Sequence, residues 1–247
     1  MNIVSELTIK ALKEKGTKPL ENYAASLLDA CEVNPPPFGM AWYGEKYRRV
    51  ACDPKWLANS LIENAAKEGE GARELWQLAS SIGVREIAEQ VRLHAIDESR
   101  HARLYIAMLD ITFSGVIDQN FRSRLYGLSP NYKAKDHLED MPKATEANVL
   151  DKLIQMNIGE IRTRINQLLL RPVILAHCSS HQRNRLMRVL DSLLLDETKH
   201  IEYTAHLLEQ AMKKGFTDFV FQTMRNRLAE FNQITLDEVG ELSFDGA

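Results

Sequence analysis

The pattern of apolar and polar positions along the chain predicts a protein built almost entirely of helices. Glycine and proline are sparse, at 12 and 8 of 247 residues, and the alternation of β-branched and polar residues that marks strands is hard to find. Long stretches instead repeat apolar residues in steps of three and four, which is the spacing of one face of an α-helix. The expected fold class is therefore all-α.

Capping and breaking residues indicate where the helices begin and end. Asp53-Pro54 has the form of an N-cap followed by proline at the first helical position, and Gly83 is a stop signal. The expected elements are short helices at 4–14 and 19–32, long helices at 54–82, 84–112, 146–176 and 181–213, a last helix at about 216–239, and an irregular connection over 113–145 with a short helix at 116–125.

Two short strings carry most of the chemical information, Asp97-Glu98-Ser99-Arg100-His101 and Asp196-Glu197-Thr198-Lys199-His200. Each contains Glu-x-x-His, and residues three apart on a helix are neighbours on one face. A carboxylate and an imidazole placed in this way can bind one metal ion together. A single copy would be weak evidence, because both residue types are common on solvated helices, but two copies in one frame are much stronger.

Both motifs fall on the apolar stripe of their helix. Burying an unpaired carboxylate costs several kcal/mol, so each glutamate needs a cation. Lysine and arginine are missing from both stripes, and a metal ion is therefore the expected counter-charge. The stripes read Val84, Ile87, Val91, His94, Glu98, His101, Tyr105, Met108 and Thr112 on one helix, and Leu186, Leu190, Leu193, Glu197, His200, Thr204, Leu207 and Ala211 on the other.

Two bridged metal ions need more oxygen ligands, and the carboxylate four-helix design adds one glutamate from each partner helix. Glu68 is the only acidic residue on the stripe of the helix before Gly83, and it lies as many residues before that glycine as Glu98 lies after it. Glu160 is the only acidic residue between positions 151 and 191, at nearly the height of Glu197, although Gln167 interrupts its apolar face. The predicted metal ligands are Glu68, Glu98, His101, Glu160, Glu197 and His200.

This ligand pattern resembles the ferritin-like diiron carboxylate superfamily over residues 54–213. The resemblance implies one ferritin-like domain over 1–247, a four-helix bundle with extra N-terminal helices (4–32) and an extra C-terminal helix (about 216–239). It also implies two iron ions as cofactors, Fe/Fe or Mn/Fe, with O2 as co-substrate.

Three branches of that superfamily add roles. The first motif is similar to the D-E-x-R-H signature of bacterial multicomponent monooxygenases, which implies that Asp97 and Asp196 each orient a histidine; a surface ion pair is the alternative. Tyr105 stands to His101 as the radical tyrosine of ribonucleotide reductase small subunits stands to its ligand, unless it is a buried tyrosine that only donates a hydrogen bond. His94 gives the form H-x-x-x-E-x-x-H, similar to arylamine N-oxygenases, and is either an additional ligand or a core histidine.

The resemblance implies an O2-dependent diiron oxidase or oxygenase that hydroxylates or N-oxygenates a small organic molecule. Such an enzyme would draw electrons from a ferredoxin or reductase, and we expect a homodimer. A ferroxidase or iron-handling protein and a radical-generating subunit using Tyr105 are the alternatives. One position departs from the soluble monooxygenases, which carry a threonine one turn after the third glutamate. It is Arg164 in this chain, and an inward-facing arginine would favour an anionic substrate.

Composition and net charge are informative mainly for the classes of partner and compartment that they exclude. The net charge of −3 argues against a nucleic-acid surface, and no run approaches the roughly 18 apolar residues of a membrane helix. The three cysteines form no C-x-x-C pair and fit a reducing compartment. The first residues are charged throughout and lack an apolar signal core. We therefore expect a cytoplasmic protein without nucleic-acid or membrane partners.

Overall fold

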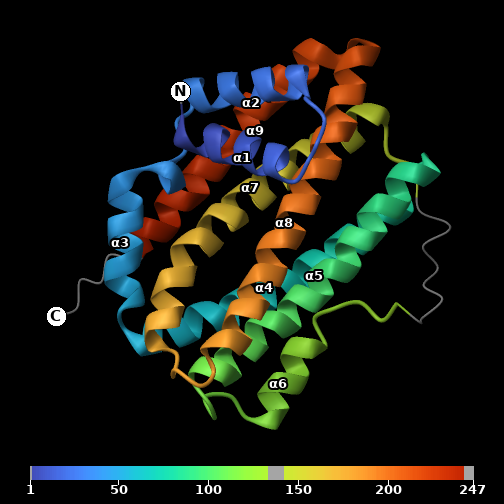
Figure 1. Cartoon of the computed structure of the whole chain (residues 1–247). Coiled ribbons are helices and arrows are strands. Elements are labelled where there is room, and N and C mark those ends of the chain that lie inside the picture. Colours follow the sequence, from blue (N-terminus) through green and yellow to red (C-terminus); the bar gives the residue numbers. More distant parts are fainter. Residues whose placement is uncertain (1, 133–141, 242–247) are drawn as a thin grey trace. The chain divides into compact units, whose positions relative to one another are not determined.

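The computed structural model describes residues 2–132 and 142–241, and the secondary structure of this part is helical, without a β-strand (Figure 1). The predicted all-α class is confirmed. None of the described helices is long and apolar enough to cross a membrane. Contacts divide the chain into two compact units, so the single domain over 1–247 stays a prediction. Unit 1 comprises Met1–Val50, Glu146–Leu170 and Glu197–Ala247, and unit 2 comprises Ala51–Thr145 and Arg171–Asp196.

The helices begin and end within three residues of the predicted bounds, with one addition. The addition is α3. Its Gly44 lowers helix propensity by about 1 kcal/mol, so the local sequence favours a helix less there. A tertiary contact supports the helix, because its Tyr43 is buried and donates a hydrogen bond to Asn166 of α7. In chain order the elements are α1 (Ile3–Glu14), α2 (Glu21–Val33), the 3-10 turn η1 (Pro37–Gly39), α3 (Ala41–Ala51), α4 (Pro54–Ser81), α5 (Arg85–Thr112), α6 (Gln119–Tyr126), α7 (Glu146–His177), α8 (Arg183–Ala211), the π-helical turn η3 (Met212–Phe216) and α9 (Thr217–Glu241).

Two long helices, α4 and α5, form the antiparallel hairpin that is the framework of unit 2. Asp53 caps α4 by accepting a hydrogen bond from the amide of Lys55, and Pro54 occupies the first helical position. Alanine and other small or aliphatic side chains fill the interface, so the two backbones approach closely. The buried residues include Leu57, Leu61, Ala65, Ala72 and Ala79 of α4 and Val91, Ala95, Ala102, Ile106 and Leu109 of α5.

The segment after α6 returns to cover one side of the α4–α5 hairpin. A Cβ added to Gly69 of α4 would lie 2.9 Å from the Cβ of Leu128, so the close approach needs a glycine. The ring of Tyr132 meets that of Trp76 edge-on, with centroids 4.7 Å apart. The hydroxyl of Tyr132 donates to the carbonyl of Ala95 on α5 at 2.7 Å. The segment is therefore attached to both helices that carry the first motif and its predicted partner.

In unit 1, a carboxylate from α8 caps the N-terminal end of α2. The preceding residue, Leu20, has no side chain that could accept from the free amides of the first turn. Glu209 of α8 instead accepts from the backbone N–H of Tyr23 and from the side chain of Asn22, both at 2.9 Å. The negative charge also complements the positive end of the helix dipole. A residue nearly 190 positions away in sequence thus replaces the local cap.

The last helix, α9, is joined to the rest of unit 1 by bidentate ion pairs. Arg225 pairs with Asp29 of α2 at 2.5 and 2.6 Å, and Arg227 pairs with Asp151 of α7 at 2.5 and 2.8 Å. Gly215, with φ of +104°, allows the chain to turn between α8 and α9. These pairs connect α2, α7 and α9 within unit 1.

Candidate metal centre

In unit 2, α4 and α5 bring Glu68, Glu98 and His101 together, and we call these residues the first set. Their ligand atoms all lie within 4.8 Å of one another. His101 Nδ1 is 3.2 Å from an oxygen of Glu98 and 3.9 Å from an oxygen of Glu68. His101 is fully buried and Glu98 is 8% exposed. Two carboxylates and one imidazole nitrogen that converge in a buried place form a donor set suited to a divalent metal ion.

His94 lies one turn before Glu98 on the same face of α5. Its Nε2 is 3.3 Å from Glu98 Oε1, and the residue is 2% exposed. Burial raises the pKa of Glu98, but hydrogen bonding with Glu68, His101 and His94 and the charge of His101 outweigh it and hold this pKa well below its usual value. A lowered pKa favours the ionised form of Glu98, which is the form that binds a metal ion. The role of His94 as an additional ligand stays a prediction.

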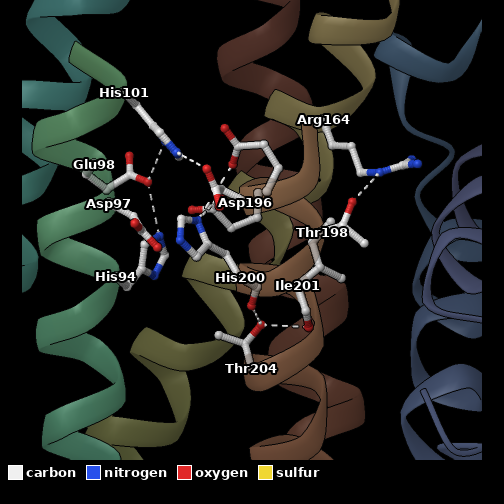
Figure 2. A network of polar contacts seen from close by, with 12 residues as sticks. His94, Asp97, Glu98, His101, Arg164, Asp196, Thr198, His200, Ile201 and Thr204 are labelled. Carbon is white, nitrogen blue, oxygen red and sulfur yellow. Dashed lines mark hydrogen bonds and ion pairs between the residues drawn. The ribbon is translucent and has the colours of Figure 1, made fainter. Parts of the chain in front are cut away.

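Asp196, the first residue of the second motif, belongs to unit 2 and lies on the Nε2 side of the His101 ring (Figure 2). It is 2% exposed, and its Oδ2 is 3.6 Å from His101 Nε2. Arg100 donates to Asp196 and to Asp97, each at 2.7 Å, and to Ser192 at 3.2 Å. A metal-bound imidazole usually donates its other N–H to a carboxylate, which is the place that Asp196 occupies. The predicted action of Asp97 on a histidine stays a prediction.

In unit 1, α7 and α8 bring Glu160, Glu197 and His200 together, and we call these residues the second set. His200 Nδ1 is 3.5 Å from an oxygen of Glu160 and 3.8 Å from an oxygen of Glu197. Glu197 and His200 are buried, and the side chain of Glu160 is 13% exposed. The second set repeats the combination of the first, and the same ring nitrogen faces the carboxylates. That all six residues serve one centre stays a prediction.

Gln167 is the close neighbour of the second set that sequence reasoning undervalued. It is buried, and its Nε2 donates to Glu197 Oε1 at 2.8 Å. In the sequence it counted only as a polar interruption on the face of Glu160. Its spacing of two helical turns from Glu160 was nevertheless a usable signal, because residues seven apart share a face. The structure assigns this amide to the orientation of the Glu197 carboxylate.

A buried chain of hydrogen bonds lies next to the second set and was not predicted. Thr204 donates to the carbonyl of His200 at 2.7 Å, Asn157 donates to Thr204 at 2.8 Å, and Tyr23 donates to Asn157 at 3.0 Å. Tyr23, Asn157 and Thr204 are at most 1% exposed. Burial, the largest cause, raises the pKa of Tyr23, so its hydroxyl keeps the proton that it donates. These hydrogen bonds connect α2 and α7 to the turn of α8 that carries His200.

Two other positions singled out in the sequence have different outcomes. Arg164 donates from Nε to Thr198 at 3.2 Å, and Figure 2 shows its guanidinium pointing away from His200. The anionic substrate that an inward-facing arginine would favour is therefore not indicated. Tyr105 is 3% exposed on α5, and its redox role stays a prediction.

Comparison with known proteins gave no match: no family model, no curated protein and no solved structure is significantly similar to the chain. The ferritin-like resemblance therefore rests on the motif residues alone. The geometry of the first set is compatible with a metal site, because its two carboxylates and its buried imidazole converge as metal ligands do. Oxygen-rich ligation with imidazole suits iron or manganese better than a structural zinc ion.

Proposed function

We propose that the protein is a non-haem dinuclear iron oxidoreductase with a ferritin-like helical bundle, which uses O2 to oxidise a small organic molecule. The observation that carries the proposal is the convergence of Glu68, Glu98 and His101, with Asp196 behind the histidine. The repeat of two glutamates and one histidine in the second set supports a second ion. That the two ions form one pair is what the carboxylate four-helix design and the ferritin-like resemblance imply.

Two residues of the first set and their neighbours have defined tasks in this proposal. Glu98 offers a carboxylate whose ionised form its neighbours favour. His101 offers Nδ1, because its Nε2 faces Asp196, and the hydrogen bond expected there fixes both the tautomer and the ring orientation. Arg100 approaches from the solvent side and balances the charge of Asp196. Burial of Glu98 and His101 limits the access of water to the ligand atoms.

The second set differs in how its ligands are oriented. Gln167 donates to one oxygen of Glu197, which leaves the other oxygen near His200. The hydrogen bond from Thr204 to the carbonyl of His200 stabilises the turn that carries the imidazole.

A bound pair of ferrous ions would supply the two electrons that reduce O2 to an oxidant able to attack a C–H bond or an amine.

Anaerobic loading with ferrous iron, followed by mixing with O2, tests the proposal. We expect rapid uptake of about one O2 per two iron ions, with an optical change that free iron in the same buffer does not give. The Glu98→Gln and Glu197→Gln variants should lose both signals, whereas Glu63→Gln, an exchange elsewhere on α4, should keep them. Uptake no faster than that of free iron, and equal in all variants, would contradict the proposal.

The main alternative is a ferroxidase or iron-handling protein, and the same preparation distinguishes it. An oxidoreductase stops taking up iron when its two sets are filled, and it needs an electron donor for further turnover. A storage protein continues to oxidise added iron and accumulates it beyond two ions per chain in a large multi-subunit shell. Iron content after repeated additions, with the assembly mass, therefore separates the two functions.

A further inference from the structure

A surface groove in unit 1 lies between α1, η1, α3 and the part of α7 that precedes Arg171. Its volume is about 380 Å³, which falls at the lower end of the range of about 300–1,000 Å³ for small-molecule sites. Its walls are mainly apolar, and two of the lining residues, Ile3 and Met40, are 46% and 38% exposed. The apolar side chains that line it include Ile3, Leu7, Phe38, Met40, Leu168 and Leu169.

The groove is separate from the second set, although both use α7. Gln167, on the face of Glu160, points to Glu197, whereas the next two residues, Leu168 and Leu169, line the groove. Consecutive residues on a helix are about 100° apart, because a turn takes 3.6 residues. The groove therefore lies on a different side of α7, and a ligand in it would not touch the second set.

Among the described residues that line the groove, Arg48 of α3 is the only charged one. Its Nη1 is 3.7 Å from the position that a Cβ on Gly44 would take, so the guanidinium lies back over the glycine, which also lines the groove. Within residues 2–132 and 142–241, no hydrogen bond or ion pair holds Arg48. One guanidinium with free donors beside an apolar trough is complementary to one anionic group joined to an apolar body.

We propose that this groove binds a medium-chain carboxylic acid, with the carboxylate on Arg48 and the apolar chain along Leu168 and Leu169. Small-molecule sites are concave and lined mainly by apolar side chains, with a few polar groups that fix the orientation of the ligand. The volume suits a chain of about ten carbons rather than a diacyl lipid. The site does not depend on the proposed function, because none of its lining residues belongs to either set.

Calorimetric titration of the full chain with decanoate tests the site, with 1-decanol as the uncharged probe. We expect one saturable site per chain with a dissociation constant of about 10–100 µM for decanoate, in line with the affinity that about a dozen non-hydrogen atoms can supply. The side chain of Trp42 donates to Met40 at the edge of the groove, so its fluorescence should change with the same midpoint.

Three variants separate the charge from the apolar trough. Arg48→Met should weaken decanoate about tenfold and leave 1-decanol unchanged. Gly44→Leu should weaken both probes at least tenfold, because its side chain would enter the groove beside Leu169, whose Cδ2 is 3.5 Å from the added Cβ. Arg49→Met, a change of a neighbouring exposed arginine outside the lining, should alter neither.

Several results would overturn the site. They are the absence of saturable binding, equal affinity of Arg48→Met and the native protein for decanoate, and equal losses in Arg48→Met and Arg49→Met. A protein whose dimerisation is abolished by Gly44→Leu, without a decanoate site, would assign the groove to a second copy instead. Circular dichroism melts of each variant ensure that a loss of binding is not a loss of folding.

Discussion

The two ligand sets have the same composition but different surroundings. In the first set, the imidazole of His101 is backed by the buried carboxylate of Asp196, which Arg100 neutralises. In the second set, the neutral amide of Gln167 donates to the ligand carboxylate of Glu197. In the structure, a carboxylate thus supports the histidine of the first set, and an amide supports a glutamate of the second.

A duplicated motif therefore need not make two equivalent metal sites. A carboxylate behind an imidazole makes the ring a stronger donor, whereas an amide on a carboxylate oxygen restricts that oxygen and withdraws charge from it. We therefore expect the first set to bind its ion more tightly than the second.

The largest effect is expected from removing a ligand imidazole. His101→Ala should lower metal affinity at the first set by more than the roughly 10–100-fold that loss of an outer partner costs, and His200→Ala should do the same at the second set. Titration with ferrous iron against a competing chelator measures both. If His101→Ala left the tighter class of site intact, the tighter ion would belong elsewhere. His181→Ala, outside both sets, serves as the control.

Removing the supporting groups gives the next effect. Asp196→Asn should lower affinity at the first set about 10–100-fold, because the amide cannot stabilise a positively polarised imidazole as a carboxylate does. Gln167→Leu should cost the second set only about three- to tenfold, the value of one net hydrogen bond. The same chelator titration applies. Equal losses in the two variants would show that the charge of Asp196 has no special role.

The buried hydrogen bonds next to the second set can be tested through the free energy of unfolding. Tyr23→Phe leaves Asn157 Oδ1 without its donor in a fully buried place, and should lower the free energy of unfolding by about 1–3 kcal/mol. Tyr43→Phe removes a weaker bond of 3.2 Å to the partly exposed Asn166, and should cost less. Denaturant unfolding of both variants makes the comparison. A greater loss in Tyr43→Phe would contradict the assigned order.

The smallest expected effect is on the stability of the fold at low pH. Hydrogen bonds from Arg227, the largest cause, hold the pKa of Asp151 below its ordinary 3.8. Because the folded form has the lower pKa, the unfolded chain binds more protons near pH 4, and the stability from this pair is present above that pH and lost as the pH falls further. Asp151→Asn should therefore flatten the acid limb of stability by about 0.2–1 kcal/mol, measured by urea unfolding between pH 3 and 6. An unchanged slope would count against the pair.

Local signals were enough to predict the helices and their order. Asp53 caps α4 through its own backbone neighbourhood, and Gly83 lies in the turn after α4. Counting from that turn also placed Glu68 level with Glu98, and the structure brings these two residues together. These predictions depend on helix rise and on chain reversal, which spacing alone determines.

Contacts between helices were less accessible to sequence reasoning. Arg100 lies off the apolar stripe, yet its long side chain reaches Asp196 on α8. Gln167 interrupts the apolar face that it shares with Glu160, and its partner Glu197 lies on another helix, α8. The bond from Tyr23 to Asn157 joins residues more than 130 positions apart. Such partners depend on how each helix is rotated about its axis, and a pattern along one helix does not specify the rotation of another.

The proposed function requires that each set hold one metal ion. The most direct measurement is the iron content of the full chain after anaerobic loading with ferrous iron and removal of free metal, determined by elemental analysis. We expect about two ions per chain, with a lower number in both the Glu98→Gln and the Glu197→Gln variants. Fewer than about one ion per chain in the native protein, unchanged in the variants, would contradict it.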